Sequence, residues 1–385
     1  MANRKRQTAL RVACVGAVLI GLTAVARLAY ADPPPRAPQA APPAALQGAL
    51  DEAVAAGNPG VIAYARRGAH EWKLAAGIAD RATGRPARPG DRWRIFSNTK
   101  SFVSTVVLQL VAERRLRLDD TVERWLPGLV HGHENDGSKV TVRQLLNHTS
   151  GIHDPTNDPR FATDRGGHTP LEVITAAMAH PPLFAPGHRW DYSNTNYLLA
   201  GMVIEAVTHH RADLEIRRRI TIPLGLTHTS FPLDDARLPG PHLHGYDMNH
   251  RDVTGFNPSA EWTAGAMIST VADLARFDTA LFGGRLLPPA QQRELQATVL
   301  DSDYGLGVHR ITVPCPGADV TVWATDGGGP GYSSVSMTTA DASRQLVLVA
   351  NVFDLARDQR HRPDQLPVPD ARAAFSTATT SVLCP

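Results

Sequence analysis

A serine and a lysine three residues apart open a strongly apolar helical segment. On a helix, Ser97 and Lys100 would lie on one face within contact distance. A serine hydroxyl is a weak nucleophile without a base beside it, and lysine can be that base when burial disfavours its ammonium form. Backbone N–H groups at a helix start can also stabilise an oxyanion. The pair indicates acyl transfer, although a capping serine beside a solvated lysine has the same pattern.

Two further segments carry groups suited to the same chemistry. Tyr192 and Asn194 lie in a polar loop between a Pro-Gly turn and an apolar helix, so both side chains can point the same way. A phenol can move a proton, and an amide can hold a substrate amide. The segment Thr325-Asp326-Gly327-Gly328 follows an apolar strand, and its glycines let a ligand approach the backbone. An ordinary tight turn is the alternative interpretation of this segment.

Hydrophobic periodicity places these segments in a mixed fold. It predicts a hairpin from 60–66 and 71–78, and a helix with a buried face over 101–116. Further helices are expected at 141–147, where a capping box opens the helix, and at 197–207, 214–220, 270–281 and 371–382. Further strands are expected at 320–324, 332–338 and 345–352. Strands at both ends indicate an antiparallel sheet flanked by helices, with an inserted all-helical lobe.

The first 31 residues have the features of a secretory signal peptide. A basic start is followed by an apolar stretch over 12–26 and by small residues at Ala29 and Ala31. A leader rich in Pro and Ala follows over 32–45, and the folded domain is expected over 46–385. The apolar stretch is short for a bilayer span, so we expect a secreted protein without a stable membrane anchor.

Composition excludes some classes of partner and indicates one crosslink. The 39 basic and 37 acidic residues nearly balance, and no nucleic-acid-binding motif occurs, so nucleic acid is not an expected partner. Cys14 lies in the signal peptide, which leaves Cys315 and Cys384 to form a disulfide in an exported protein. The histidines at His131 and His133 lack a recognised ligand spacing, so no metal site is predicted.

The order of the motifs resembles that of the penicillin-recognising serine hydrolases. This family includes class C β-lactamases, secreted D-alanyl-D-alanine carboxypeptidases and related esterases. The stretches 145–151, 223–226, 264–270 and 304–307 match as well, and the likeness covers roughly 46–385. The resemblance implies a β-lactamase/transpeptidase-like α/β fold, with the active site in the groove between an α/β lobe and an all-helical lobe.

Position by position, the resemblance assigns roles to the candidate residues. Ser97 would be the nucleophile, Lys100 its activating partner, and Tyr192 the general base and acid. Asn194 would bind the acyl-side amide of the substrate, and the backbone N–H groups of Ser97 and Gly328 would form the oxyanion hole. The implied partners are small peptides, esters or β-lactams and also cell-wall peptidoglycan. We expect a monomer that needs no metal and no cofactor.

The third motif departs from the family pattern. Relatives usually begin it with Lys or His and continue with hydroxyl residues, whereas this chain has Thr325 and Asp326. An ionised Asp326 would repel the terminal carboxylate of a carboxypeptidase substrate, and His309 stands where carboxypeptidases can place an arginine. We therefore expect weak carboxypeptidase activity and a better fit for esters, amides or amine-bearing D-residue substrates. The alternatives are an esterase, a D-amino-acid-specific acyltransferase or cyclase, and a catalytically weak penicillin- or cell-wall-binding protein.

Overall fold

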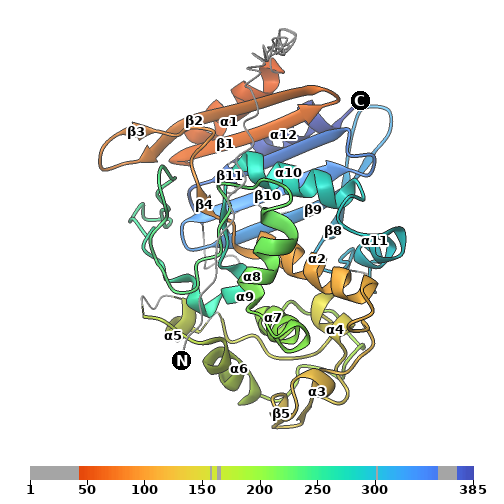
Figure 1. Cartoon of the computed structure of the whole chain (residues 1–385). Helices are drawn as coiled ribbons and strands as arrows, with labels where there is room; N and C mark the ends of the chain where they lie inside the picture. Colours follow the sequence, from red (N-terminus) through yellow and green to blue (C-terminus); the bar gives the residue numbers. More distant parts are fainter. Residues whose placement is uncertain (1–42, 157, 163–165, 301, 354–370) are drawn as a thin grey trace, which may run out of the picture. The chain divides into compact units, whose positions relative to one another are not determined.

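A seven-stranded antiparallel sheet organises the part of the chain that the structure describes. The computed structural model describes residues 43–353, apart from 157, 163–165 and 301, and residues 371–385. The predicted signal peptide and most of the predicted leader lie outside the described residues. The strand order is β3-β2-β1-β11-β10-β9-β8 (Figure 1). The strands are β1 (Gly60–Arg67), β2 (His70–Asp80), β3 (Arg85–Pro86), β8 (His309–Val313), β9 (Val320–Gly329), β10 (Tyr332–Thr339) and β11 (Arg344–Ala350).

The two ends of the chain meet at the centre of this sheet. Strand β1 pairs with its hairpin partner β2 on one side and with β11 on the other, where Val61 lies opposite Ala350. The Gly60 N–H also donates to Asn351 Oδ1 at 2.6 Å. The predicted β-lactamase/transpeptidase-like architecture, with a sheet built from both chain ends, is confirmed.

Helices cover both faces of the sheet. Helices α1 and α12 pack together on one face, α10 lies on the other, and the remaining helices form most of the inserted lobe (Figure 1). None of the helices in the described ranges is long and apolar enough to span a bilayer. The helices are α1 (Ala44–Ala55), α2 (Thr99–Ala112), α3 (Val122–Trp125), α4 (Val142–Leu146), α5 (Pro159–Ala162), α6 (Pro170–Met178), α7 (Asn194–Thr208), α8 (Ala212–Ile216), α9 (Trp262–Gly265), α10 (Val271–Phe282), α11 (Pro289–Gln296) and α12 (Arg372–Leu383).

Local chemistry explains where two helices begin and end. At α4, Thr141 and Gln144 form the predicted capping box, with each side chain bonded to the backbone of the other. Helix α2 ends at Ala112, four residues earlier than periodicity predicted. Arg114 adopts the left-handed conformation at φ 58°, and the next N–H bonds back to the Leu110 carbonyl. Apolar spacing alone does not show such a stop.

The predicted disulfide between Cys315 and Cys384 is present. The sulfur atoms are 2.00 Å apart. Cys315 follows strand β8, and Cys384 follows helix α12, so the bond fastens the terminal helix to the edge of the sheet. The bond closes a chain segment of 69 residues, which restricts the unfolded chain and stabilises the fold.

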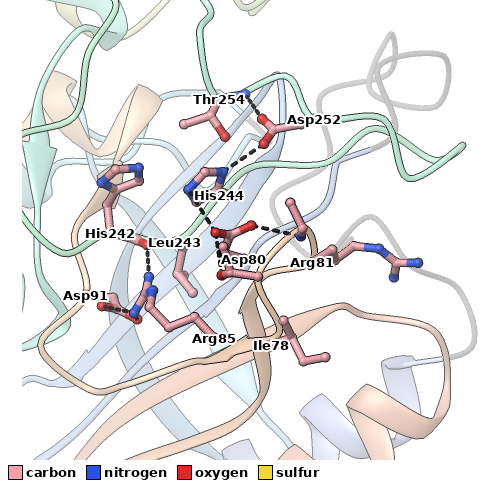
Figure 2. A network of polar contacts seen from close by, with 12 residues as sticks. Ile78, Asp80, Arg81, Arg85, Asp91, His242, Leu243, His244, Asp252 and Thr254 are labelled. Atoms are coloured by element: carbon pink, nitrogen blue, oxygen red, sulfur yellow. Dashed lines mark hydrogen bonds and ion pairs between the residues drawn. The ribbon is translucent and has the colours of Figure 1, made fainter.

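A polar network holds residues 242–252 (Figure 2), which pass the β9–β10 turn where the Tyr332 hydroxyl donates to the Leu243 carbonyl. Arg85 donates to both oxygens of Asp91, at 2.9 and 3.0 Å, and to the His242 carbonyl. His244 Nδ1 lies 2.7 Å from Asp252 Oδ2, and its Nε2 lies 4.0 Å from Asp80. The network therefore fixes residues 242–252 against the β2–β3 edge of the sheet.

One buried carboxyl should make stability depend on pH. Asp278 is fully buried on α10, beside the Ser336 hydroxyl of β10, and burial raises the pKa of its carboxyl to about 7. Because this lies above the unfolded value, the group stabilises the fold fully below about pH 4, and that contribution is lost as the pH rises towards 7. Asp278→Asn should therefore be more stable than the wild type at pH 8, by up to roughly 4 kcal/mol, and nearly equal to it at pH 4.

Urea unfolding at both pH values measures this difference. The control is Asp341→Asn, because hydrogen bonds from Thr339 and Ser343 lower the pKa of exposed Asp341 to about 2. The sign for Asp341 is opposite, since its contribution is present at neutral pH and lost on acidification. A lower stability of Asp278→Asn at pH 8 would contradict the assignment.

Candidate active site

Ser97 is presented on a strained turn. It lies in the single 3-10 turn Phe96–Asn98 that leads into α2, and Phe96 has a φ of 43°, which is unusual for a residue with a side chain. Phe96 is buried, and its ring lies 6.0 Å from that of Phe256 and 6.4 Å from that of Tyr332. Packing thus holds a conformation that costs of order 1–3 kcal/mol and fixes the position of the serine.

The structure brings Ser97, Lys100 and Tyr192 into direct contact. Ser97 Oγ lies 2.5 Å from the Tyr192 hydroxyl and 2.9 Å from Lys100 Nζ. The serine and the lysine share one helical face, and the tyrosine arrives from the loop before α7. These distances are suitable for proton transfer from and to the serine hydroxyl.

Lys100 is almost fully buried, with three oxygen partners. Its Nζ donates to Asn194 Oδ1 at 2.7 Å and to the Ala264 carbonyl at 3.0 Å, and Ser97 Oγ is the third partner. The rings of Tyr192 and Tyr197 also lie within 5.5 Å of Nζ. Two of these oxygens, Asn194 Oδ1 and the Ala264 carbonyl oxygen, carry no hydrogen and can only accept hydrogen bonds. A neutral amine would therefore use its two hydrogens there and direct its lone pair at Ser97.

Tyr192 remains a neutral phenol in this site. Burial raises the pKa of its hydroxyl well above the ordinary value, and the hydrogen bond with Ser97 lowers it. The nearby carboxylates of Asp326, Glu261 and Asp154 raise this pKa further. The phenol can therefore donate or relay a proton at neutral pH.

The Tyr192 ring is held by His148. The two rings stack with centroids 4.3 Å apart. His148 Nδ1 accepts the Ser193 N–H at 3.1 Å, and its carbonyl accepts the Asp191 N–H at 3.0 Å. These bonds fix the loop that carries the phenol.

Asn194 is hydrogen-bonded at both ends of its amide, and the two acceptors at the NH2 end are residues that the motif analysis missed. Its Nδ2 donates to Asp154 Oδ2 at 3.2 Å and to Thr156 Oγ1 at 2.8 Å, while its Oδ1 accepts from Lys100. Asp154 Oδ2 also accepts the Asn194 backbone N–H at 2.9 Å, at the start of α7. Asp154 and Thr156 follow the stretch 145–151, but no spacing marks them as partners of a residue about 40 positions away.

The glycine-rich segment is a strand and not the tight turn considered as an alternative. Strand β9 continues to Gly329, and the turn falls at Pro330 and Gly331. A Cβ at Gly327 would overlap the Ile95 carbonyl, and one at Gly329 would overlap the Phe96 ring. The glycines therefore allow β9 to pack directly against the turn that carries Ser97. The proposed pairing of the Ser97 and Gly328 N–H groups in an oxyanion hole remains a prediction.

Thr325 faces the protein interior. Its hydroxyl donates to Asn98 Oδ1 at 2.7 Å, and Asn98 Nδ2 donates to the Ile95 carbonyl at 2.7 Å and to Ser334 Oγ at 3.0 Å. Thr325 thus ties β9 to the nucleophile turn. It supplies no charge where relatives usually place Lys or His.

Asp326 is the acidic side chain of this segment, and it is partly exposed to solvent. Its side chain is 43% exposed, and its Oδ1 lies 3.4 Å from Nδ1 of His309, which is 2% exposed. Burial lowers the pKa of the His309 imidazole, so the ring is neutral at neutral pH and offers Asp326 no positive charge. Strand β8 pairs with β9 only as far as Ala324, so Asp326 lies beyond the end of that pairing.

His131 and His133 lie outside this site, whereas Trp262 starts the helix whose backbone contacts Lys100. His131 and His133 are exposed at the hairpin formed by β5 (His131–Gly132) and β6 (Asn135–Asp136). Trp262 begins α9 and is mostly buried, two residues before the Ala264 carbonyl that contacts Lys100.

Comparisons with known proteins agree with this geometry. The Beta-lactamase family model matches residues 46–367. The putative penicillin-binding protein PbpX of Bacillus subtilis is 26% identical over 304 residues, which cover 78% of this chain and 72% of that protein. The structure of a D-stereospecific amidohydrolase from Streptomyces sp. is 42% identical with a TM-score of 0.73, covering 80% of this chain and 94% of that one. D-amino acid amidase from Ochrobactrum anthropi SV3 is 27% identical with a TM-score of 0.76, covering 88% and 97%. The chain is therefore a serine hydrolase that belongs to the Beta-lactamase family.

Proposed function

We propose that this protein is an exported amidase that hydrolyses amides of D-amino acids bearing a free α-amine. The observation that carries the proposal is the partly exposed carboxylate of Asp326 on β9, beside Gly327, which packs against the Ile95 carbonyl next to the turn that holds Ser97. A protonated amine is the group that such a carboxylate binds best. The amidohydrolase and amidase named above support the choice of substrate, and the predicted signal peptide supports export.

The reaction would proceed through an ester on Ser97. As Ser97 Oγ attacks the substrate carbonyl, its proton passes to Lys100, and a C–O bond forms. The amide C–N bond then breaks, and the departing ammonia or amine receives a proton through the Tyr192 phenol, which Lys100 replenishes. Water attacks the ester, Lys100 accepts its proton, and Ser97 Oγ is reprotonated as the D-amino acid leaves.

The same carboxylate disfavours carboxypeptidase activity. A peptide ending in D-alanine would bring its terminal carboxylate towards Asp326, and no cation from Thr325 offsets the repulsion. Rapid release of D-alanine from a D-Ala-D-Ala peptide would contradict the proposal.

The test compares three amides on the wild type and on Asp326→Asn. We expect kcat/KM to be highest for D-phenylalanine amide, and lower for its L enantiomer and for 3-phenylpropionamide, which lacks the amine. In Asp326→Asn, kcat/KM for D-phenylalanine amide should fall roughly 10- to 100-fold, because a charge-assisted hydrogen bond contributes about 1.5–3 kcal/mol. The value for 3-phenylpropionamide should hardly change.

Asp319→Asn is the matched control. Asp319 is exposed just before β9, and its replacement removes the same charge at the far end of the strand. We expect this variant to behave like the wild type. Equal losses for the amine-bearing and the amine-free amide in Asp326→Asn would show that Asp326 does not bind the amine.

A further inference from the structure

Both hydrogens of the Asn194 amide are already used inside the protein. One hydrogen bonds Asp154 Oδ2 and the other bonds Thr156 Oγ1. We infer that Asp154 and Thr156 form a clamp that makes Asn194 a positioning residue for Lys100, and that the clamp selects against substrates whose α-amine is acylated. This inference rests on the proposed function and deepens it, because it explains how the same site rejects N-acylated compounds.

Chemistry fixes the orientation of the clamped amide. Turning it over would place the NH2 group against Lys100 Nζ, so that two donors would meet, and would place Oδ1 against the Asp154 carboxylate. With the observed orientation, every group has a complementary partner. Lys100 consequently meets an acceptor at 2.7 Å that cannot rotate away.

Asp154 and Thr156, which form the clamp, are also hydrogen-bonded to each other. Thr156 Oγ1 donates to Asp154 Oδ1 at 2.8 Å, and the Thr156 N–H donates to the same oxygen at 3.0 Å. Asp154 Oδ2 meanwhile accepts two N–H groups of Asn194, from the backbone and from the amide. Thr156 is 5% exposed and Asn194 is 8% exposed, so little water can replace these bonds.

The clamp affects the two kinds of substrate differently. The carbonyl of an acylated amine needs a donor, and the Asn194 N–H groups can serve it only after one clamp bond breaks. Breaking one clamp hydrogen bond in this way lowers the rate of acylation by the N-acylated substrate roughly tenfold. A free ammonium group needs acceptors instead, and it meets the carboxylate of Asp326.

The decisive variant is Thr156→Val, which keeps the size of the side chain and frees one hydrogen of the Asn194 amide. Three substrates are compared: D-phenylalanine amide, N-acetyl-D-phenylalanine amide and p-nitrophenyl acetate, which has no α-substituent and reports acylation of Ser97. The matched control is Thr195→Val. Thr195 is buried next to Asn194, but its hydroxyl donates to the His153 carbonyl at 2.9 Å and does not touch the amide.

We expect the kcat/KM of the N-acetyl amide, relative to p-nitrophenyl acetate, to rise about tenfold in Thr156→Val. It should stay at the wild-type value in Thr195→Val and in Thr156→Ser, which restores the hydroxyl. An unchanged ratio in Thr156→Val, or an equal rise in Thr195→Val, would overturn the clamp. If the wild type does not prefer D-phenylalanine amide, the proposed function fails, yet the ratio to p-nitrophenyl acetate still tests the clamp.

Discussion

Replacing Ser97 with alanine is expected to lower kcat/KM for D-phenylalanine amide and for p-nitrophenyl acetate by roughly 10⁴-fold or more. The hydroxyl is the atom on which Lys100 and Tyr192 converge, at 2.9 and 2.5 Å. Without it no acyl-enzyme ester can form, and the residual rate would come from substrate binding and electrostatics alone. The intact mass of the protein after incubation with benzylpenicillin or p-nitrophenyl acetate shows directly whether the acyl-enzyme forms.

Ser193→Ala is the matched control for this variant. Ser193 is the neighbour of Tyr192, but its hydroxyl faces the His153 carbonyl at 3.4 Å. We expect Ser193→Ala to retain acylation at a rate near that of the wild type. A covalent adduct that persists in Ser97→Ala would show that another residue is the nucleophile.

Lys100→Met should have the second largest effect, a fall of roughly 10³-fold in the rate of acylation. Methionine matches the length of the lysine stem but cannot accept the serine proton. It also leaves Asn194 Oδ1 and the Ala264 carbonyl without their buried donor, so some loss of stability should accompany the loss of rate.

Single-turnover acylation by p-nitrophenyl acetate, measured on protein shown to be folded, separates these two effects. The control is Lys73→Met, because Lys73 is exposed on strand β2 and lies outside the site. If Lys100→Met acylates as fast as the wild type, the base must be another group, and the Tyr192 phenol would be the next to test by Tyr192→Phe.

The local parts of the site could be predicted from the sequence. The relative positions of Ser97 and Lys100 follow from their spacing of three residues at the start of a helix. The polar loop before α7 is also a short-range pattern. The same holds for the capping box at α4 and for the hairpin of β1 and β2. In each case the residues that determine the local structure lie close together in the sequence.

The contacts that complete the site are long-range and were missed. Asp154 and Thr156 bond Asn194 across about 40 residues, and Thr325 bonds Asn98 across 227. Nothing in their local sequence distinguishes them from surface polar residues. The glycines of β9 belong to the strand itself, although their local sequence is typical of a turn. Their requirement comes from the close approach of Phe96 and Ile95, which only the folded chain shows.

The pairing of β1 with β11 also dictates the order in which the protein can fold. Synthesis delivers the β1–β2 hairpin first, yet the second edge of β1 must wait for residues 344–350. The helical lobe lies between them in sequence and can use shorter-range contacts, whereas closing the sheet brings together residues about 290 positions apart and should be slow. Until that closure, β1 presents an unpaired edge of apolar residues such as Val61 and Ile62. A chain truncated before β11 should therefore aggregate through this strand even though its Ser97, Lys100 and Tyr192 are all present.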